Sequence, residues 1–132
     1  MESIKDMLNG REVFTVQSGS TIKETVNYMA SKKVGLVPVL DRERLLGVFS
    51  ERDLVKRVIA EEKDLITTTV DDVMSTSLVV AKIDESTESI LAKMKVAKTR
   101  HILVIDNEKL VGVLSIRDLL EMDLNHCKTT VE

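Results

Sequence analysis

The chain repeats itself at an offset of 65 residues, and this duplication constrains its fold more than any other feature. Residues 20–57 align without a gap on residues 85–122. Within the match, Val, Asp, Glu, Leu, Gly, Val, Ser, Arg, Asp and Leu recur at equivalent positions, which is more than chance alignment gives. An internal repeat of this kind indicates a supersecondary unit, so the 132-residue chain contains two copies of one such unit.

Each copy shows the same order of secondary-structure patterns. Short runs of β-branched residues predict strands, and apolar residues at helical spacing predict helices. The first copy is expected to contain a strand, a helix, two hairpin strands and a closing helix at residues 13–16, 21–32, 36–40, 45–49 and 50–63. The equivalent elements of the second copy are expected at residues 78–81, 86–97, 102–105, 110–114 and 115–124. Pro38 should place its strand at a sheet edge or a bulge, because proline cannot donate to a sheet ladder.

The pattern predicts an α/β fold of the α+β type, made of two β-α-β-β-α repeats related by pseudo-twofold symmetry. One copy of about 60 residues leaves an apolar face uncovered, and a second copy can cover it. We place the boundary so that the repeats span residues 1–65 and 66–132. The connector at residues 64–77 contains no Gly or Pro, and we expect a short helix there at residues 70–74, which residues 4–8 resemble.

Composition narrows the classes of function. Lys and Arg total 19 against 22 Asp and Glu, and aromatic residues are 2%, which argues against a nucleic-acid binder. Neither a membrane span of roughly 20 apolar residues nor an N-terminal signal region is present, so we expect neither membrane association nor export. The single cysteine, Cys127, favours a reducing, cytoplasmic compartment. His101 and His126 lack the spacing of a metal site, and no structural metal is expected.

One segment of each copy carries residues suited to binding a phosphate and a sugar. In Gly47–Asp53 and Gly112–Asp118, a serine stands where a strand passes into a helix, and an aspartate follows three residues later. The unpaired N–H groups of a helix N-terminus attract phosphate, and an aspartate can accept hydrogen bonds from two ribose hydroxyls. Arg52 and Arg117, which lie between the serine and the aspartate, can pair with a phosphate.

The same residues also have a purely structural interpretation. Ser-x-x-Asp at a helix start is an N-cap with an acidic residue in the first turn, and it stabilises a helix by about 1 kcal/mol. Its presence in both copies does not separate the two interpretations, because a duplicated cap is copied as well. The Gly-Val-hydrophobic strand that precedes each motif makes it more specific than an isolated cap. Both interpretations are open at the level of sequence.

The repeated β-α-β-β-α order, the apolar-Val-Asp turn and the Gly-Val-hydrophobic-Ser-x-x-Asp segment resemble a tandem pair of CBS domains, a Bateman module. The resemblance covers about residues 2–124. It implies a regulatory sensor, not an enzyme, which binds AMP, ADP, ATP or S-adenosylmethionine in clefts between the repeats. It implies no obligatory cofactor, and it implies assembly into a homodimer.

Carried over onto this sequence, the resemblance implies ribose and phosphate contacts through the serine and aspartate of each motif, at Ser50, Asp53, Ser115 and Asp118. It places residues of the first and middle strands near the base, at Thr15, Val16, Leu36, Pro38, Val80, Ala81, His101 and Ile102. Arg100 and His101 also resemble phosphate-contacting residues of nucleotide-binding members, and the first copy lacks this basic pair. They can serve their own cleft or the other one. Alternatively, Arg100 is a solvated helix-end charge and His101 a partly buried strand residue.

Two hypotheses of function follow. The first is a stand-alone regulatory module in which an adenosyl ligand shifts the packing of the repeats and signals to a protein partner that the sequence does not identify. The second is a ligand-free structural module whose motifs are helix caps. Its apolar helix faces would then mediate self-association or docking to an enzyme or transporter, through Leu54, Val55, Val58, Leu119 and Leu120. Catalysis is not expected, because no acid–base or nucleophile set converges in the sequence.

Overall fold

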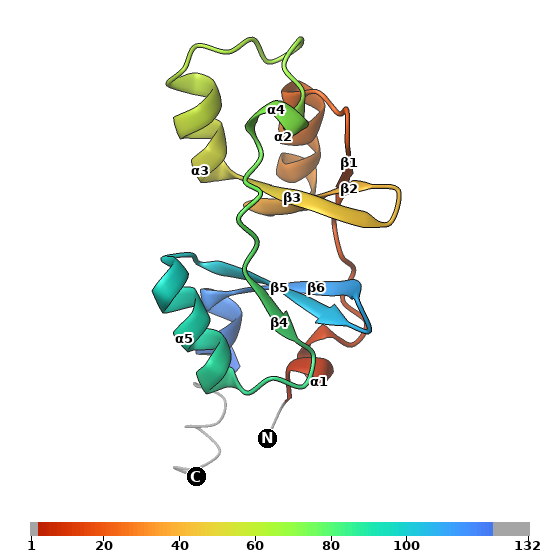
Figure 1. Ribbon diagram of the computed structural model, residues 1–132, viewed down its shortest axis with the longest axis vertical. Helices are drawn as coiled ribbons and strands as arrows, with labels where there is room; N and C mark the ends of the chain where they lie inside the picture. The colour runs from red at the N-terminus through yellow and green to blue at the C-terminus, as the bar shows by residue number, and fades with distance from the viewer. Residues whose placement is uncertain (1–2, 123–132) are drawn as a thin grey trace. The chain divides into compact units, whose positions relative to one another are not determined.

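The computed structural model describes residues 3–122, and these residues form two compact units (Figure 1). One unit comprises residues 14–78 and is called the central unit here. The other combines residues 3–13 with residues 79–122 and is called the terminal unit. The chain therefore passes from one unit to the other twice, after residue 13 and after residue 78. The division of the sequence repeats at residue 65 stays a prediction, because the units are defined by contacts and not by the repeat.

The central unit contains a three-stranded sheet, four helices and the connector. Its strand order is β1-β2-β3, with β1 parallel and β3 antiparallel to the central strand β2. In chain order its elements are β1 (Val16–Gln17), α2 (Ile22–Lys32), β2 (Leu36–Asp41), β3 (Arg44–Ser50), α3 (Glu51–Asp53), the π-helix η1 (Leu54–Ile59) and α4 (Val70–Val73). The predicted short helix of the connector is confirmed as α4.

The terminal unit repeats this arrangement with the other copy. Its strand order is β4-β5-β6, again with one parallel and one antiparallel pair. Its elements are α1 (Ile4–Leu8), β4 (Val80–Lys82), α5 (Thr87–Ala97), β5 (His101–Asp106), β6 (Lys109–Ser115) and a helical segment at residues 116–122. The β-α-β-β-α order and the α+β class are confirmed in both units. None of the helices described between residues 3 and 122 has the length and apolar character that a bilayer-spanning segment requires.

The two longest helices begin and end with clear local signals. The Thr21 side chain accepts a hydrogen bond from the Glu24 N–H at 3.1 Å, and the Glu24 carboxylate accepts one from the Thr21 N–H. Ser86 caps α5 in the same position. Both helices end at a lysine in the left-handed conformation, Lys33 and Lys98, so the duplicated lysine marks the helix end.

Each unit has a core of its own, built from one face of its helices and alternate residues of its middle strand. The central core contains Val16, Ile22, Met29, Val37, Val39, Phe49, Val58, Val70 and Val73. The terminal core contains Ile4, Leu8, Ala81, Ile90, Met94, Ile102, Val104, Leu114, Leu119 and Met122. The methionines at helical spacing are core residues, since Met29 and Met94 are both buried. Each core also contains two apolar residues of a short helix, α4 or α1.

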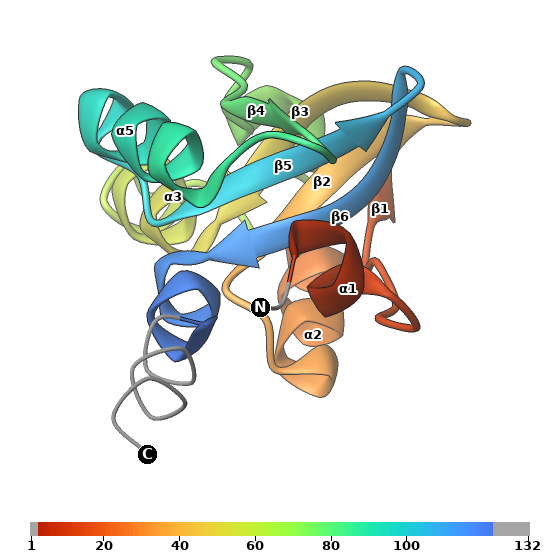
Figure 2. The same cartoon turned by 90° about the horizontal axis from the view of Figure 1, so that it is seen from below.

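The two short helices explain why a glycine recurs in both copies. By sequence, α1 precedes the first copy, but it packs in the terminal unit, where Figure 2 shows it against β6. A Cβ at Gly112 would lie 2.7 Å from Leu8 Cδ2. By sequence, α4 precedes the second copy, but it packs in the central unit, and a Cβ at Gly47 would lie 2.6 Å from the Ser75 carbonyl oxygen. The repeated glycine therefore leaves room for the segment that crosses β3 or β6.

The prediction that Pro38 lies in an edge strand or at a bulge is wrong. Its strand β2 is the central strand of the sheet, and Pro38 stands in register with Val48 of β3. The register shift of the β2–β3 pair lies between Val39 and Leu40, and β5–β6 has the same shift without a proline. The N–H that Pro38 lacks is not needed for pairing with β1, because the pairing of β1 with β2 begins only at Val16, opposite Val39. The first strand is therefore shorter and later than the predicted 13–16.

The first closing helix also differs from the prediction. The sequence predicts a helix that runs to about residue 63, but α3 and η1 together end at Ile59. The π geometry is carried by bonds such as the Ala60 N–H to the Val55 carbonyl at 2.9 Å. The wider turn places Val58 in the core and leaves Arg57 at the surface, whereas Met122, the equivalent of Arg57, is a core residue in the other copy.

Candidate functional site

The motif of the central unit is a complete capping box. Ser50 is the last residue of β3 and the N-cap of α3, and its Oγ accepts a hydrogen bond from the Asp53 N–H at 3.3 Å. In return, Asp53 Oδ2 accepts hydrogen bonds from the Ser50 N–H at 3.0 Å and from the Ser50 hydroxyl at 3.1 Å. The predicted N-cap geometry is thus confirmed. The Asp53 side chain is only 11% exposed, so this is a buried carboxylate and not a surface cap.

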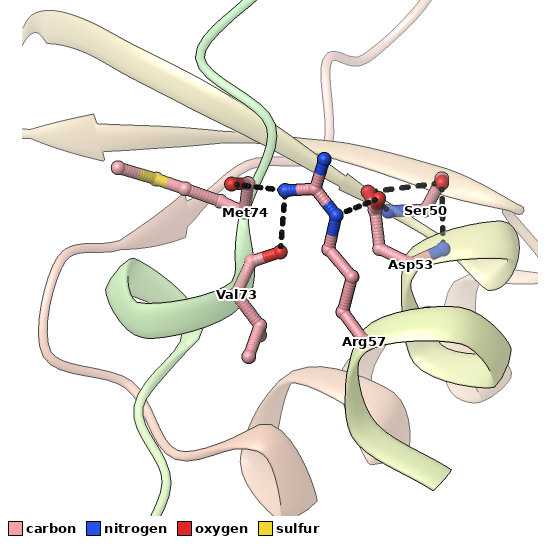
Figure 3. Close-up of polar contacts among 5 residues, drawn as sticks. All are labelled: Ser50, Asp53, Arg57, Val73 and Met74. Atoms are coloured by element: carbon pink, nitrogen blue, oxygen red, sulfur yellow. Dashed lines mark hydrogen bonds and ion pairs between the residues drawn. The ribbon is translucent and has the colours of Figure 1, made fainter. Parts of the chain in front are cut away.

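Arg57 joins this carboxylate to the end of α4 (Figure 3). Its Nε lies 3.6 Å from Asp53 Oδ1, and its guanidinium donates to the Met74 carbonyl at 3.0 Å and to the Val73 carbonyl at 3.4 Å. These carbonyls belong to the last turn and the C-cap of α4, where a cation is favourable. The arginine therefore links the motif to the segment through which the chain leaves the central unit.

The motif of the terminal unit repeats the capping box but obtains its arginine from elsewhere. The Asp118 N–H donates to Ser115 Oγ at 3.1 Å, and the Ser115 N–H donates to Asp118 Oδ2 at 2.8 Å. Arg11 contacts both carboxylate oxygens of Asp118, with N–O distances of 3.2 and 3.3 Å. This two-point contact joins residues 107 positions apart in the chain. The Asp118 side chain is 18% exposed and the Arg11 side chain 39%.

A tight turn brings Arg11 to this position. The turn begins at Leu8, the last residue of α1, and Asn9 has φ −61° and ψ 122°. Gly10 follows with φ 77°, and the Arg11 N–H donates to the Leu8 carbonyl at 3.0 Å. These angles are those of a type II turn, which requires glycine at its third position. Because Leu8 is fixed in the core against Gly112, the turn holds Arg11 beside the motif.

The surroundings of Asp118 favour its ionised form. Burial by itself raises the pKa of this carboxyl, but hydrogen bonds from the Ser115 N–H and the Arg11 guanidinium and the charge of Arg11 outweigh burial. The pKa of Asp118 therefore lies below its ordinary value. The Asp118 carboxylate is therefore ionised at neutral pH.

The remaining predicted site residues fall into three classes of exposure. Buried residues are Val16, Pro38, Ala81 and Ile102, half-buried ones are Thr15, Leu36 and His101, and exposed ones are Val80, Arg52, Arg100 and Arg117. The side chains of Val16, Ala81 and Ile102 belong to the two cores, so these positions offer a ligand mainly their backbone. Val80, which is 40% exposed, is the predicted apolar residue most open to a planar base.

The two motifs differ in charge at one equivalent backbone position. The Glu51 N–H donates to the Gly35 carbonyl at 3.0 Å, and the Ile116 N–H donates to the Arg100 carbonyl at 2.8 Å. A Cβ at Gly35 would lie 3.3 Å from Glu51 Oε1, so a carboxylate stands over this position in the central unit. The terminal unit has an exposed arginine in place of the glycine. At this position the terminal motif therefore carries a cation, whereas the central motif carries a carboxylate.

Sequence reasoning missed the two arginines that hold the motif aspartates. Arg57 stands four residues after Asp53, a spacing that indicates a helical ion pair, but its bonds to the end of α4 depend on the fold. The Asn9–Gly10 pair signals a turn before Arg11, but nothing local points to Asp118. Among residues 3–122 no group of three His, Cys, Asp or Glu could hold a metal ion. Cys127 and His126 lie outside the described residues.

With this geometry established, the chain can be compared with known proteins. The CBS domain family model matches it twice, at residues 4–60 and 70–125. The chain belongs to the CBS-domain family. It is 34% identical over 119 residues to the CBS domain-containing protein YhcV of Bacillus subtilis, a match that covers 90% of this chain and 84% of YhcV. It is also 34% identical over 113 residues to inosine-5'-monophosphate dehydrogenase of Methanocaldococcus jannaschii, a match that covers 84% of this chain but only 22% of the relative.

Solved structures of CBS-domain proteins share the fold over nearly the whole chain. A CBS-domain-containing protein of Agrobacterium tumefaciens has a TM-score of 0.85 and 31% identity, covering 92% of this chain and 99% of that one. A CBS domain protein of Pyrobaculum aerophilum, solved in complex with AMP, has a TM-score of 0.79 and 28% identity, covering 94% of this chain and 99% of that one. The protein is thus a tandem CBS pair.

Proposed function

We propose that this CBS pair is a regulatory module, not an enzyme, and that it reversibly binds an adenosyl ligand at its Ser-x-x-Asp motifs. The observation that carries the proposal is the state of the two motif aspartates, which are largely buried and fixed by an arginine each. A helix cap alone needs no burial, and burying a charged group is costly unless it is paired. Two fixed carboxylates at strand-to-helix junctions suit the recognition of a vicinal diol. The AMP complex of the Pyrobaculum aerophilum relative supports this ligand class.

The terminal motif is the better nucleotide site of the two. Arg100 and Arg117 are both exposed, and both lie near the N-terminus of the helical segment 116–122. A phosphate gains from both guanidinium groups, which can donate charge-assisted hydrogen bonds to it. In the central unit the carboxylate of Glu51 opposes the same phosphate. We therefore assign phosphate-bearing ligands, AMP, ADP or ATP, to the terminal motif, and leave S-adenosylmethionine, which has no phosphate, as the ligand better suited to the central one.

The proposed regulation follows from differential affinity. A ligand that prefers one arrangement of the CBS pair shifts the population towards it, and a protein partner that distinguishes the arrangements reads the change. We propose a homodimer as the assembled form and a reducing, cytoplasmic compartment as its location, the latter in keeping with the single cysteine. No obligatory cofactor is part of this function.

A second candidate function is a ligand-free interaction module, and one surface favours it. A groove of about 480 Å³ lies between α2 and the α3–η1 helix, lined by the apolar residues Val26, Met29, Ala30, Val34 and Leu54 with Lys33 and Glu51. Next to it, Val55 and Ile59 of η1 are more than half exposed. Such a face suits docking to another protein.

Thermal unfolding with and without ligand separates the two functions. At 100 times its dissociation constant, a ligand that binds only the folded state adds about 2.7 kcal/mol of stability. We expect millimolar AMP, ADP or ATP to raise the unfolding temperature of the wild type and to lose most of this effect in Asp118→Asn. Asp106→Asn, which changes an exposed aspartate at the end of β5, is the matched control and should respond as the wild type does. No shift with any adenosyl ligand would favour the interaction module.

A further inference from the structure

The guanidinium of Arg11 binds both oxygens of the Asp118 carboxylate, as the ribose of a bound nucleotide would. Its two terminal nitrogens contact Oδ1 at 3.3 Å and Oδ2 at 3.2 Å, while the Ser115 N–H donates to a further lone pair of Oδ2 at 2.8 Å. A vicinal diol binds a carboxylate in the same way, with two neighbouring donors directed at the two oxygens. The ribose of a nucleotide and the side chain of Arg11 therefore require the same acceptor sites.

We propose that Arg11 is an internal competitor for the terminal nucleotide site, and that a nucleotide binds Asp118 only when Arg11 leaves it. This inference rests on the proposed function. It makes the affinity for nucleotide depend on the fraction of molecules in which the Arg11–Asp118 pair is open. It also gives binding a structural consequence, since Arg11 belongs to residues 9–13, the last residues of the terminal unit before the chain enters the central one.

The central motif lacks this competition and serves as an internal comparison. Arg57 approaches Asp53 through its Nε alone, at 3.6 Å, and its terminal nitrogen is held by the carbonyls of Val73 and Met74. It contacts one carboxylate oxygen, whereas Arg11 contacts both. A ligand at Asp53 can bind without expelling Arg57 from its carbonyl partners. The release of an arginine is therefore specific to the terminal motif.

The anchoring of Arg11 is weak enough to be reversible. Its side chain is 39% exposed, and pairs of this exposure have a small net free energy of formation. The backbone around it is held by the Arg11 N–H to Leu8 carbonyl bond of the type II turn at 3.0 Å. Opening the ion pair leaves this turn without its side-chain anchor. We expect residues 9–13 to become more mobile when nucleotide replaces Arg11.

Calorimetric titration of AMP into the full chain tests the competition. In Arg11→Ala the carboxylate is always open, and we expect AMP to bind roughly three- to tenfold more tightly than to the wild type. Arg11→Lys keeps the charge but cannot contact both oxygens in the same way, so its affinity should lie between the two. Arg44→Ala, which removes an exposed arginine of β3 in the central unit, is the control and should match the wild type. Amide hydrogen exchange of residues 9–13 should become faster when AMP is added to the wild type.

The outcomes separate this inference from the function on which it rests. If the wild type binds AMP and Arg11→Ala binds it equally or more weakly, Arg11 is no competitor and the nucleotide-binding function stands. Slower exchange at residues 9–13 on AMP addition would overturn the inference in the same way. Binding by Arg11→Ala and not by the wild type supports the competition in its strongest form. If neither variant binds AMP, ADP or ATP, both the nucleotide-binding function and the competition are wrong.

Discussion

The two motifs share their sequence pattern and their local geometry, yet the arginines that pair with their aspartates come from different parts of the repeat. In the central unit Arg57 comes from the motif's own helix and reaches the backbone after α4. In the terminal unit Arg11 comes from the segment after α1 and reaches the motif. In both cases the result is an aspartate tied to the segment that leads the chain into the other unit. The duplication has thus preserved the linkage although the linking residue differs.

This difference shows which interactions a duplicated sequence determines. Ser-x-x-Asp fixes its capping box within four residues, so both copies form it. The partner of the carboxylate depends on how the remote segments pack, and these are not duplicated residue for residue. The equivalent of Arg57 is the buried Met122, and Arg11 lies before residue 20, where the gapless alignment of the two copies begins. The two units therefore differ most in the long-range contacts that their motif aspartates make.

Exchanging the equivalent residues of the two middle strands, β2 and β5, should have the largest effect on stability. The Leu103 N–H donates to the Val79 carbonyl at 3.0 Å, a bond that Pro38, its equivalent in β2, cannot form. Leu103→Pro removes this bond and a buried side chain, and we expect it to lower the free energy of unfolding by about 3 kcal/mol. Pro38→Leu, the reverse exchange, should change it by less than about 1.5 kcal/mol. Urea denaturation of both variants checks this, and equal losses would contradict our account of β1.

Substitutions of the two glycines at the motifs should give an effect of similar size. In Gly47→Ala the new Cβ meets a backbone oxygen of Ser75 at 2.6 Å, whereas in Gly112→Ala it meets the methyl groups of the Leu8 side chain. We expect a loss of about 3 kcal/mol for Gly47→Ala and about 1 kcal/mol for Gly112→Ala, because only the side chain can move aside cheaply. Chemical denaturation measures both. A larger loss at Gly112 would show that the crossing of β6 by α1 is the tighter one.

A smaller difference is expected between the two arginines. Arg57→Ala loses the bonds to two backbone carbonyls as well as an ion pair, and it should cost about 1 kcal/mol of stability. Arg11→Ala loses a partly exposed pair, and it should cost about 0.5 kcal/mol. Paired unfolding curves at neutral pH would measure this difference. The reverse order would mean that Arg11, not Arg57, is the structural anchor.

The smallest effect is expected in the dependence of the free energy of unfolding on acidic pH. The pKa of Asp118 is below its ordinary value in the folded state, so ionised Asp118 favours folding above the pKa of the unfolded chain, about 3.9. This contribution disappears as the pH falls through the lower, folded-state pKa. Asp118→Asn cannot lose it, so as the pH is lowered below about 5 its stability should fall less steeply than that of the wild type. Parallel curves for the two proteins would show that the folded environment leaves this carboxyl unperturbed.

The sequence is most informative where interactions are local. The element order within each copy and the short helix α4 follow from residues a few positions apart, and both are confirmed. The position of Pro38 is predicted wrongly because the pairing of β1 with β2 begins only beyond it, which no local rule reveals. The π-helix and the two arginines escape prediction for the same reason. They depend on packing across many residues, and the site assignments beyond the motifs remain predictions.

The central claim is that the carboxylate of the terminal motif binds the ribose of a nucleotide. Calorimetric titration of AMP into the wild type, Asp118→Asn and Asp53→Asn tests it most directly. We predict that Asp118→Asn weakens binding roughly ten- to a hundredfold, because a charge-assisted hydrogen-bond partner is worth about 1.5–3 kcal/mol, and that Asp53→Asn has a smaller effect. Circular dichroism should show that both variants are folded. An Asp118→Asn variant that is folded and binds AMP with unchanged affinity would contradict the claim.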